Sequence, residues 1–379
     1  MPQEGESAAS TGAAGSTLGG LDMASDIDRP SAAMEAGGFY NRYSLVPSGG
    51  GALALPHLER AVADVPLEPI DDPIVIADYG SSQGLNSLAP MRLAIESVRR
   101  RSSADRPIMI YHIDQPSNDF NSLFELLDQS PDRLTLHDSR VFPCAIYENV
   151  LPPNSAHIGW SSYAAMWVRR IPALIPGHFA FQRSTGEVRA AWERQGAEDW
   201  ESFLSLRALE LRAGGCLVIS VPGADEHGGS VFERVLDHAN AELATMVDEG
   251  AISAEERRRM ALNVWPRRMA DLVAPFAGGR FHSLSLKASE TCLLPDAAWA
   301  AYEEDHDGQA LATKQAMFFR AVFAPTLASY LDAVRAFGRG ASAAFTDRLT
   351  SGVKRRLAAD PGHLNLLVQI LVVAKGAEQ

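Results

Sequence analysis

Apolar segments of strand length alternate with amphipathic segments of helical length between about residues 73 and 222. Runs rich in Ile and Val, such as PIVIAD and CLVISVP, are typical of buried strands, whereas apolar residues spaced three and four apart, as in LNSLAPMRLAIESVRRR, predict helices. Such alternation is typical of an α/β protein whose parallel sheet is covered by helices on both faces. The predicted strands are 73–78, 106–114, 155–160 and 214–222, and the predicted helices are 85–101, 118–129 and one that begins near Trp200.

Other segments depart from this alternation. The Gly/Pro-rich stretch 46–56 predicts a break in regular structure after a short element, FYNRYSLV. Residues 280–288 and 364–375 predict a closing pair of strands. Two long stretches, 224–278 and 295–360, are rich in Ala, Leu, Arg and Glu at helical spacing. Because they are too long for loops, we expect them to form a helical cap over one end of the sheet.

The N-terminal segment differs in composition from the rest of the chain. Residues 1–36 are mostly Ala, Gly, Ser and acids, which cannot bury enough apolar surface to order themselves. We therefore expect a disordered tail over 1–36 and a single capped domain over 37–379. The chain has no basic region followed by an apolar core, and this predicts a cytoplasmic protein without a signal peptide.

Charge and composition exclude several classes of partner. The net charge of −13 argues against a nucleic acid or an anionic membrane, because binding to phosphates needs a basic surface. No apolar run reaches the length of a membrane span. The cysteines, Cys144, Cys216 and Cys292, match no metal or redox spacing, and the histidines form no HxxH or HxxxH pair. We therefore expect reduced thiols and no metal site.

The loop after the first predicted strand suggests a ligand. Asp78 ends this strand, and Gly80 and Gly84 allow a tight turn and a close approach of the backbone. The spacing fits neither the dinucleotide fingerprint nor the P-loop. Asp114 ends the second strand and would lie at the same edge of the sheet. Two acids suit a cationic nucleoside with ribose hydroxyls, which points to S-adenosylmethionine.

Four segments resemble those of one known family, the plant SABATH carboxyl methyltransferases. The resemblance covers the chain from about residue 38 to its end and is strongest over 74–172. It implies a class I methyltransferase fold, with a mostly parallel seven-stranded sheet, a closing antiparallel strand and a helical cap. The similar segments are ADYGSSQGLNSL (77–88), HIDQPSNDFNSLFELL (112–127), FPCAIYENVLPPNSAHIGWSSYAAMWVRRIP (142–172) and FFRAVFAPTL (318–327).

The resemblance also implies a donor site. An aromatic residue and a serine flank the adenine in the family, whereas this chain has Ile146 and Ala145 at those positions. The residues implied to bind S-adenosylmethionine are Ser44, Asp78, Gly80 and Asn86 at the methionine end, Asp114 and Gln115 at the ribose, and Ala145 and Ile146 at the adenine.

The acceptor site follows from the same resemblance. Trp167 would position the acceptor carboxylate with its indole N–H, and no side chain is expected to act as an acid or base, because a carboxylic acid is ionised at neutral pH. Pro47 stands where the family has a glutamine that donates a second hydrogen bond. The implied substrate-binding residues are Tyr40, Pro47, Trp160, Tyr163, Met166, Trp167 and Phe319.

The sequence thus predicts methyl transfer to a small aromatic or otherwise apolar carboxylic acid. One alternative is a purine-like ring nitrogen as acceptor, which the loss of the glutamine at Pro47 favours. Another is a scaffold or sensor that binds the donor without activity. The resemblance further implies a homodimer.

Overall fold

The computed structural model describes residues 34–68, 72–103, 105–129, 138–226, 228–230, 232–332 and 340–376. Most of the expected tail, residues 1–33, therefore lies outside the described residues. Residues 34–36 lie inside them, and Glu35 donates its backbone N–H to Ala321 O at 3.0 Å. This contact joins the start of the described chain to a helix near its end.

A seven-stranded sheet forms the centre of the molecule, with strand order β3-β2-β1-β4-β5-β7-β6. Strands β3, β2, β1, β4 and β5 are parallel, and β7 runs antiparallel to both β5 and β6. This is the expected mostly parallel sheet with its closing antiparallel strand. The strands are β1 (Ile74–Tyr79), β2 (Ile108–Asp114), β3 (Asp138–Pro143), β4 (Ala156–Ser162), β5 (Leu211–Pro222), β6 (Leu284–Leu293) and β7 (Leu367–Lys375).

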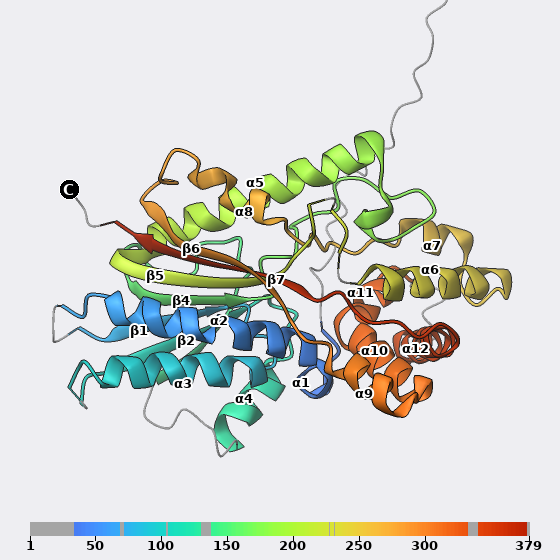
Figure 1. The fold of residues 1–379 in the computed structure, drawn as a ribbon, viewed down its shortest axis with the longest axis horizontal. Coiled ribbons are helices and arrows are strands. Elements are labelled where there is room, and N and C mark those ends of the chain that lie inside the picture. The colour runs from blue at the N-terminus through green and yellow to red at the C-terminus, as the bar shows by residue number, and fades with distance from the viewer. Residues whose placement is uncertain are drawn as a thin grey trace, which may run out of the picture.

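Helices cover both faces of the sheet and gather beyond one of its ends (Figure 1). Helices α2 (Leu45–Asp64) and α3 (Leu85–Arg99) lie on one face, and α5 (Gly186–Glu210) and α8 (Met269–Val273) lie on the other. Short elements complete the chain: α1 (Phe39–Tyr43), α4 (Phe120–Gln129) and the 3-10 turns η1 (Phe181–Arg183) and η2 (Ala274–Phe276). The helices beyond the end are α6 (Glu233–Asp248), α7 (Ala254–Arg259), α9 (Ala297–Asp305), α10 (Gly308–Val322), α11 (Ala324–Ala328) and α12 (Ala341–Ala359).

Two expectations about helices were wrong. The Gly/Pro-rich stretch 46–56 is not a break but part of the 20-residue helix α2. Its glycines serve close packing: a Cβ on Gly50 would lie 2.4 Å from the hydroxyl of Tyr163. The helix expected to begin near Trp200 begins at Gly186, and β5 already starts at Leu211 and runs through the Gly-Gly pair.

The core consists of apolar clusters on the two faces of the sheet and one in the cap. The cap cluster includes Phe232, Leu243, Phe319, Phe323 and Leu349, all almost fully buried. It also contains Tyr163 and Met166, which follow β4, so the cap packs directly on the end of the sheet. Within the described residues, no helix is long and apolar enough to cross a membrane.

Candidate active site

The glycine loop after β1 packs too closely for side chains. Gly80 has a φ of +104°, and a Cβ there would lie 2.3 Å from the Cβ of Ala164. The loop is fixed from the next strand, because Ser82 donates its backbone N–H to Asp114 Oδ2 at 2.7 Å. Asn118 donates its side-chain amide to Ser82 O at 2.8 Å. The loop therefore presents backbone to whatever ligand lies above it.

Asp114 lies at the carboxyl end of β2 and faces a cavity. Its Oδ1 accepts the backbone N–H of Gln115 at 2.8 Å. Burial raises the pKa of Asp114 to about 6, and the nearby Asp78 adds to this, while the N–H groups of Ser82 and Gln115 oppose it. A ligand with hydroxyl groups or positive charge would therefore favour the ionised carboxylate.

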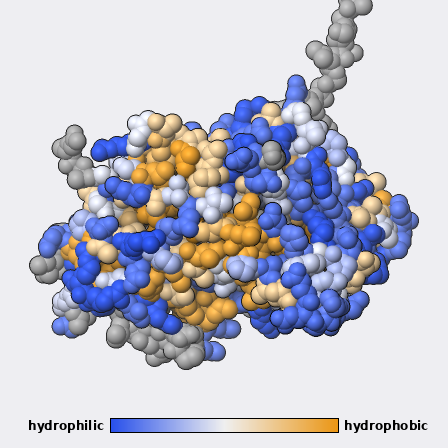
Figure 2. Space-filling model, viewed as in Figure 1, coloured by the Kyte–Doolittle hydropathy of each residue, from blue (hydrophilic) through white to orange (hydrophobic). Residues whose placement is uncertain are grey.

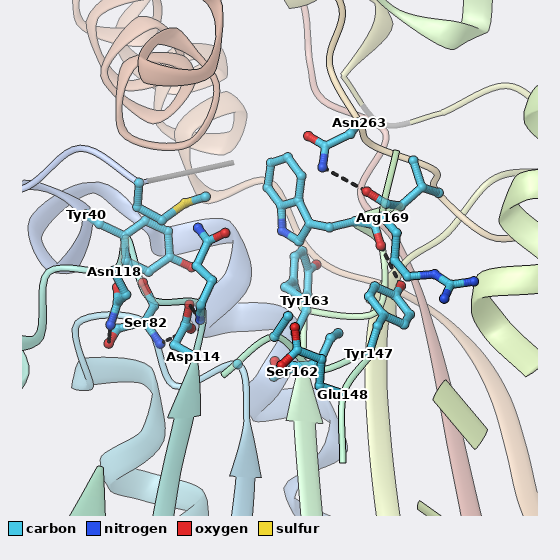
Figure 3. A pocket seen from close by; sticks show the side chains of 18 residues that line it. Tyr40, Ser82, Asp114, Asn118, Tyr147, Glu148, Ser162, Tyr163, Arg169 and Asn263 are labelled. Carbon is cyan, nitrogen blue, oxygen red and sulfur yellow. Dashed lines mark hydrogen bonds between the residues drawn. The ribbon is translucent and has the colours of Figure 1, made fainter. Parts of the chain in front are cut away.

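This cavity, called the main cavity below, has a volume of about 470 Å³ and lies beyond the carboxyl ends of β1, β2 and β4 (Figure 3). A backbone cradle at Gly80 and a buried carboxylate at Asp114 fit the ribose and amino-acid portion of S-adenosylmethionine. The predicted residues that line the cavity are Tyr40, Gly80, Asp114, Gln115, Ala145, Ile146, Tyr163 and Trp167.

The predicted Ser44, Asp78 and Asn86 do not line this cavity. The side-chain amide of Asn86 donates a hydrogen bond to Ser44 Oγ at 3.1 Å and is also hydrogen-bonded to the hydroxyl of Tyr40. Asp78 is only 1% exposed, and its Oδ2 has no hydrogen-bond partner among the described residues. That oxygen lies 3.9 Å from His112 Nδ1, on the neighbouring strand.

A second, much smaller cavity of about 20 Å³ lies on the cap side of the same residues. Tyr40, Tyr163 and Trp167 line both cavities, so the two share a wall. Burial raises the pKa values of the Tyr40 and Tyr163 hydroxyls well above their usual range, so both stay neutral. The predicted Pro47 and Met166 line the small cavity, together with Met34, Phe232, Phe318, Val322 and Phe323.

Trp167 is held by its backbone. Its N–H donates to Ala164 O at 3.1 Å, and its carbonyl accepts the hydroxyl of Tyr147 at 2.5 Å. Its indole N–H has no hydrogen-bond partner among the described residues, whereas those of Trp192 and Trp200 donate to backbone carbonyls. Trp167 therefore offers an uncommitted donor to the cavity.

Of the residues predicted to bind the substrate, two line neither cavity. Trp160 lies within β4 and packs in the core beneath α2 and α3, so its side chain does not reach past the end of the strand. Phe319 is fully buried inside the cap. On helix α10 the neighbouring Phe318, with Val322 four residues later, faces the small cavity, and consecutive helical residues cannot share a face.

Several residues that line the two cavities were not predicted from the sequence. Ser82 and Asn118 lie within the similar segments, where their polar side chains were a usable signal. Asn263 and its neighbours were expected to be helical, but 260–266 forms no helix and runs beside 164–168. The other residues lining the main cavity that were not predicted are Met34, Tyr147, Glu148, Ser162, Ala164, Val168 and Arg169.

A buried ion pair supports the loop that carries Ala145 and Ile146. Arg207 donates to Glu210 Oε1 at 2.9 Å and to Ile146 O at 2.8 Å. Glu210 also accepts the backbone N–H of Val150 at 2.8 Å and the hydroxyl of Tyr79 at 2.7 Å. The pair thus joins this loop to β1.

The cysteines show no sign of reactivity. Burial raises the pKa of Cys216 to about 12. Burial and the nearby Glu148 raise that of Cys144 to about 11, and burial also raises that of Cys292. Within the described residues, no group of three or more His, Cys, Asp or Glu could hold a metal ion.

The fold and the cavity together define a class I S-adenosylmethionine-dependent methyltransferase. A solved structure of a loganic acid methyltransferase with SAH superposes with a TM-score of 0.72 at 23% identity, covering 91% of this chain and 99% of that one. The chain belongs to the family described as SAM dependent carboxyl methyltransferase, whose sequence model matches residues 35–371.

Relatives of similar sequence include plant enzymes that act on small acids. A loganic acid O-methyltransferase of Catharanthus roseus is 32% identical over 51% of this chain and 56% of its own. A benzoic acid/salicylic acid carboxyl methyltransferase of Petunia hybrida is 28% identical over 57% of this chain and 66% of its own. The match thus spans less than two thirds of the length of each relative.

Proposed function

We propose that the protein transfers the methyl group of S-adenosylmethionine to the carboxylate of a small-molecule acid. The observation that carries this proposal is one cavity that joins the glycine loop and Asp114 to the uncommitted indole N–H of Trp167. The first two suit the donor, and the third suits a carboxylate oxygen. The family and the named substrates of its relatives support the same reaction.

In this reaction the side chains mainly position the donor and the acceptor. The acid is already ionised at neutral pH, so its oxygen can attack without a base. S-adenosylmethionine supplies the methyl group on its sulfonium, and holding the two reactants aligned can lower the barrier by about 7–11 kcal/mol. Met34, at the start of the described chain, and Asn263 line the cavity from outside the sheet. With both reactants bound they would help to exclude water, which favours the union of opposite charges.

Methyl transfer from radiolabelled S-adenosylmethionine to a panel of carboxylic acids and purines tests the proposal. An ester product extracts into organic solvent and is lost in mild base, whereas an N-methyl product is stable to base. Product that survives base would favour the ring-nitrogen alternative, which Pro47, buried and without a donor, leaves open. Donor binding without turnover of any acceptor would instead favour the scaffold or sensor.

We further propose that the protein forms a homodimer and is located in the cytoplasm. Strand β6 forms one edge of the described sheet, and Leu293 on it is 63% exposed. Figure 2 shows apolar residues gathered across the middle of this face, where α2, β6 and β7 come to the surface. A charge substitution, Leu293→Glu, should shift a dimer toward monomer in light scattering, and fractionation of the source cells tests the location.

A further inference from the structure

The small cavity is too small to hold an acceptor. A volume of about 20 Å³ accommodates roughly one water molecule. Its wall is a cluster of aromatic rings, with centroids 5.2 Å apart for Phe232 and Phe318 and 5.6 Å apart for Phe232 and Phe323. All three rings are almost fully buried. Apolar substituents therefore find no space on the cap side of Trp167.

The main cavity instead continues past Trp167 along residues 167–169 toward Asn263. Arg169 lines this part, but its guanidinium makes two hydrogen bonds to α5: Nε donates to Asp199 Oδ1 at 2.5 Å and Nη2 to Ser202 Oγ at 3.3 Å. Figure 3 shows Asn263 above the cavity and the end of the Arg169 side chain directed away from it. Asn263 is therefore a polar group that an acceptor can meet beyond Trp167.

The orientation of the Asn263 amide is fixed by its neighbours. Its Nδ2 donates to Val168 O at 2.9 Å, and Val168 donates its backbone N–H to Asn263 O at 2.8 Å. Because only the NH₂ group can donate to a carbonyl, the Oδ1 atom points away from Val168. The residue is only 8% exposed, and Oδ1 has no hydrogen-bond partner among the described residues. Asn263 thus lines the cavity with an amide oxygen that accepts no hydrogen bond from the described residues.

We propose that Asn263 makes the enzyme selective for acids that carry a hydroxyl or N–H group away from the carboxylate. This inference rests on the proposed function, in which Trp167 donates to the carboxylate. The two groups are then complementary: Trp167 offers a donor to one end of the acceptor, and Asn263 offers an acceptor atom to the other. A bound acid without such a group would cover Oδ1 and leave it unpaired, which lowers the rate for that acid.

Matched acids test this selectivity. The panel contains benzoate, its 3- and 4-hydroxy derivatives and the corresponding methoxy acids, with indole carboxylates and their N-methyl forms as a second series. We expect kcat/KM to be at least about tenfold higher for the best donor-bearing acid than for its methylated counterpart, the value of one hydrogen bond. In Asn263→Ala this ratio should fall to within about twofold of unity.

The ratio separates selectivity from a structural role. If Asn263 only holds residues 164–168 in place, Asn263→Ala lowers both rates together and leaves the ratio unchanged. Asn240→Ala is the matched control, because it removes an amide that likewise donates to a backbone carbonyl, that of Gly177 at 3.0 Å, away from the cavity. This control should keep the wild-type ratio.

The outcomes also separate this inference from the proposed function. Turnover with no preference for hydroxyl or N–H groups in the wild type, or a preference that survives in Asn263→Ala, overturns the inference and leaves the proposed reaction intact. Failure to methylate any acid, while calorimetry shows that the donor binds, overturns the proposed reaction and the inference with it.

Discussion

Replacing Glu210 by alanine should cost a large part of the stability of the fold. Glu210 accepts from Arg207, Val150, Leu151 and Tyr79 at 2.7–3.3 Å, and it is fully buried. Its removal leaves the Arg207 guanidinium without its counter-charge in the core. Breaking a buried pair in this way costs about 3–5 kcal/mol. The guanidinium also lies 4.2 Å from the centre of the Tyr79 ring, so the disturbance reaches β1.

Urea unfolding followed by circular dichroism measures this loss. The double substitution Arg207→Met/Glu210→Leu should recover part of it, because no isolated charge then remains buried. The loop that carries Ala145 and Ile146 should loosen in Glu210→Ala, so that affinity for S-adenosylhomocysteine falls, as calorimetry can show. A loss below about 1 kcal/mol, or a double variant no more stable than the single one, would refute the reasoning.

Further predictions concern the cavity. Trp167→Phe should keep the bulk of the side chain but remove the donor, so kcat/KM for the acid should fall at least about tenfold with little change in donor affinity by calorimetry. Because the pKa of Asp114 is about 6 in the absence of donor, affinity for the donor should weaken as pH falls below 6, and Asp114→Asn should abolish this dependence. Protonation of Asp114 has the opposite effect on the stability of the donor-free fold. With its pKa raised from 3.8, Asp114 stabilises the donor-free fold below about pH 4, and this contribution is lost as pH rises through 6, which pH-dependent unfolding checks. Gly80→Ala should abolish donor binding, because its Cβ would lie 2.3 Å from another Cβ, whereas Gly177→Ala, also at positive φ but with open space around it, should bind normally.

Strands and helices with a clear local pattern of apolar residues could be predicted from the sequence. Apolar runs ending in an acid placed Asp78 and Asp114 at the same edge of the sheet, and β1 and β2 indeed pair in parallel. Strand β3 was not predicted, because the short segment DSRVFP mixes polar residues with few apolar ones. The glycines of α2 suggested a break, because the reason for them is close packing against residues far away in the sequence, as for Gly50 against the Tyr163 ring.

The same distinction holds for the candidate site. Gly80, Asp114 and Trp167 each lie in a segment that resembles the family, so a resemblance could assign them, and all three line the cavity. Asn263 and Phe318 come from segments whose position over the sheet depends on the packing of the whole cap, which no local spacing encodes. Trp160 shows the converse, since its place within β4 sets it in the core beneath the helices.

Methyl transfer from a donor labelled with ¹³C at the methyl group, followed by NMR of the purified product, tests the central claim most directly. The best acid of the panel serves as acceptor, and Trp167→Phe serves as the matched variant. We expect the ¹³C-methyl signal of a methyl ester, which disappears on mild alkaline hydrolysis, and a strongly reduced rate of ester formation in the variant. A label on nitrogen or carbon, or an ester formed equally fast without the indole N–H, would contradict it.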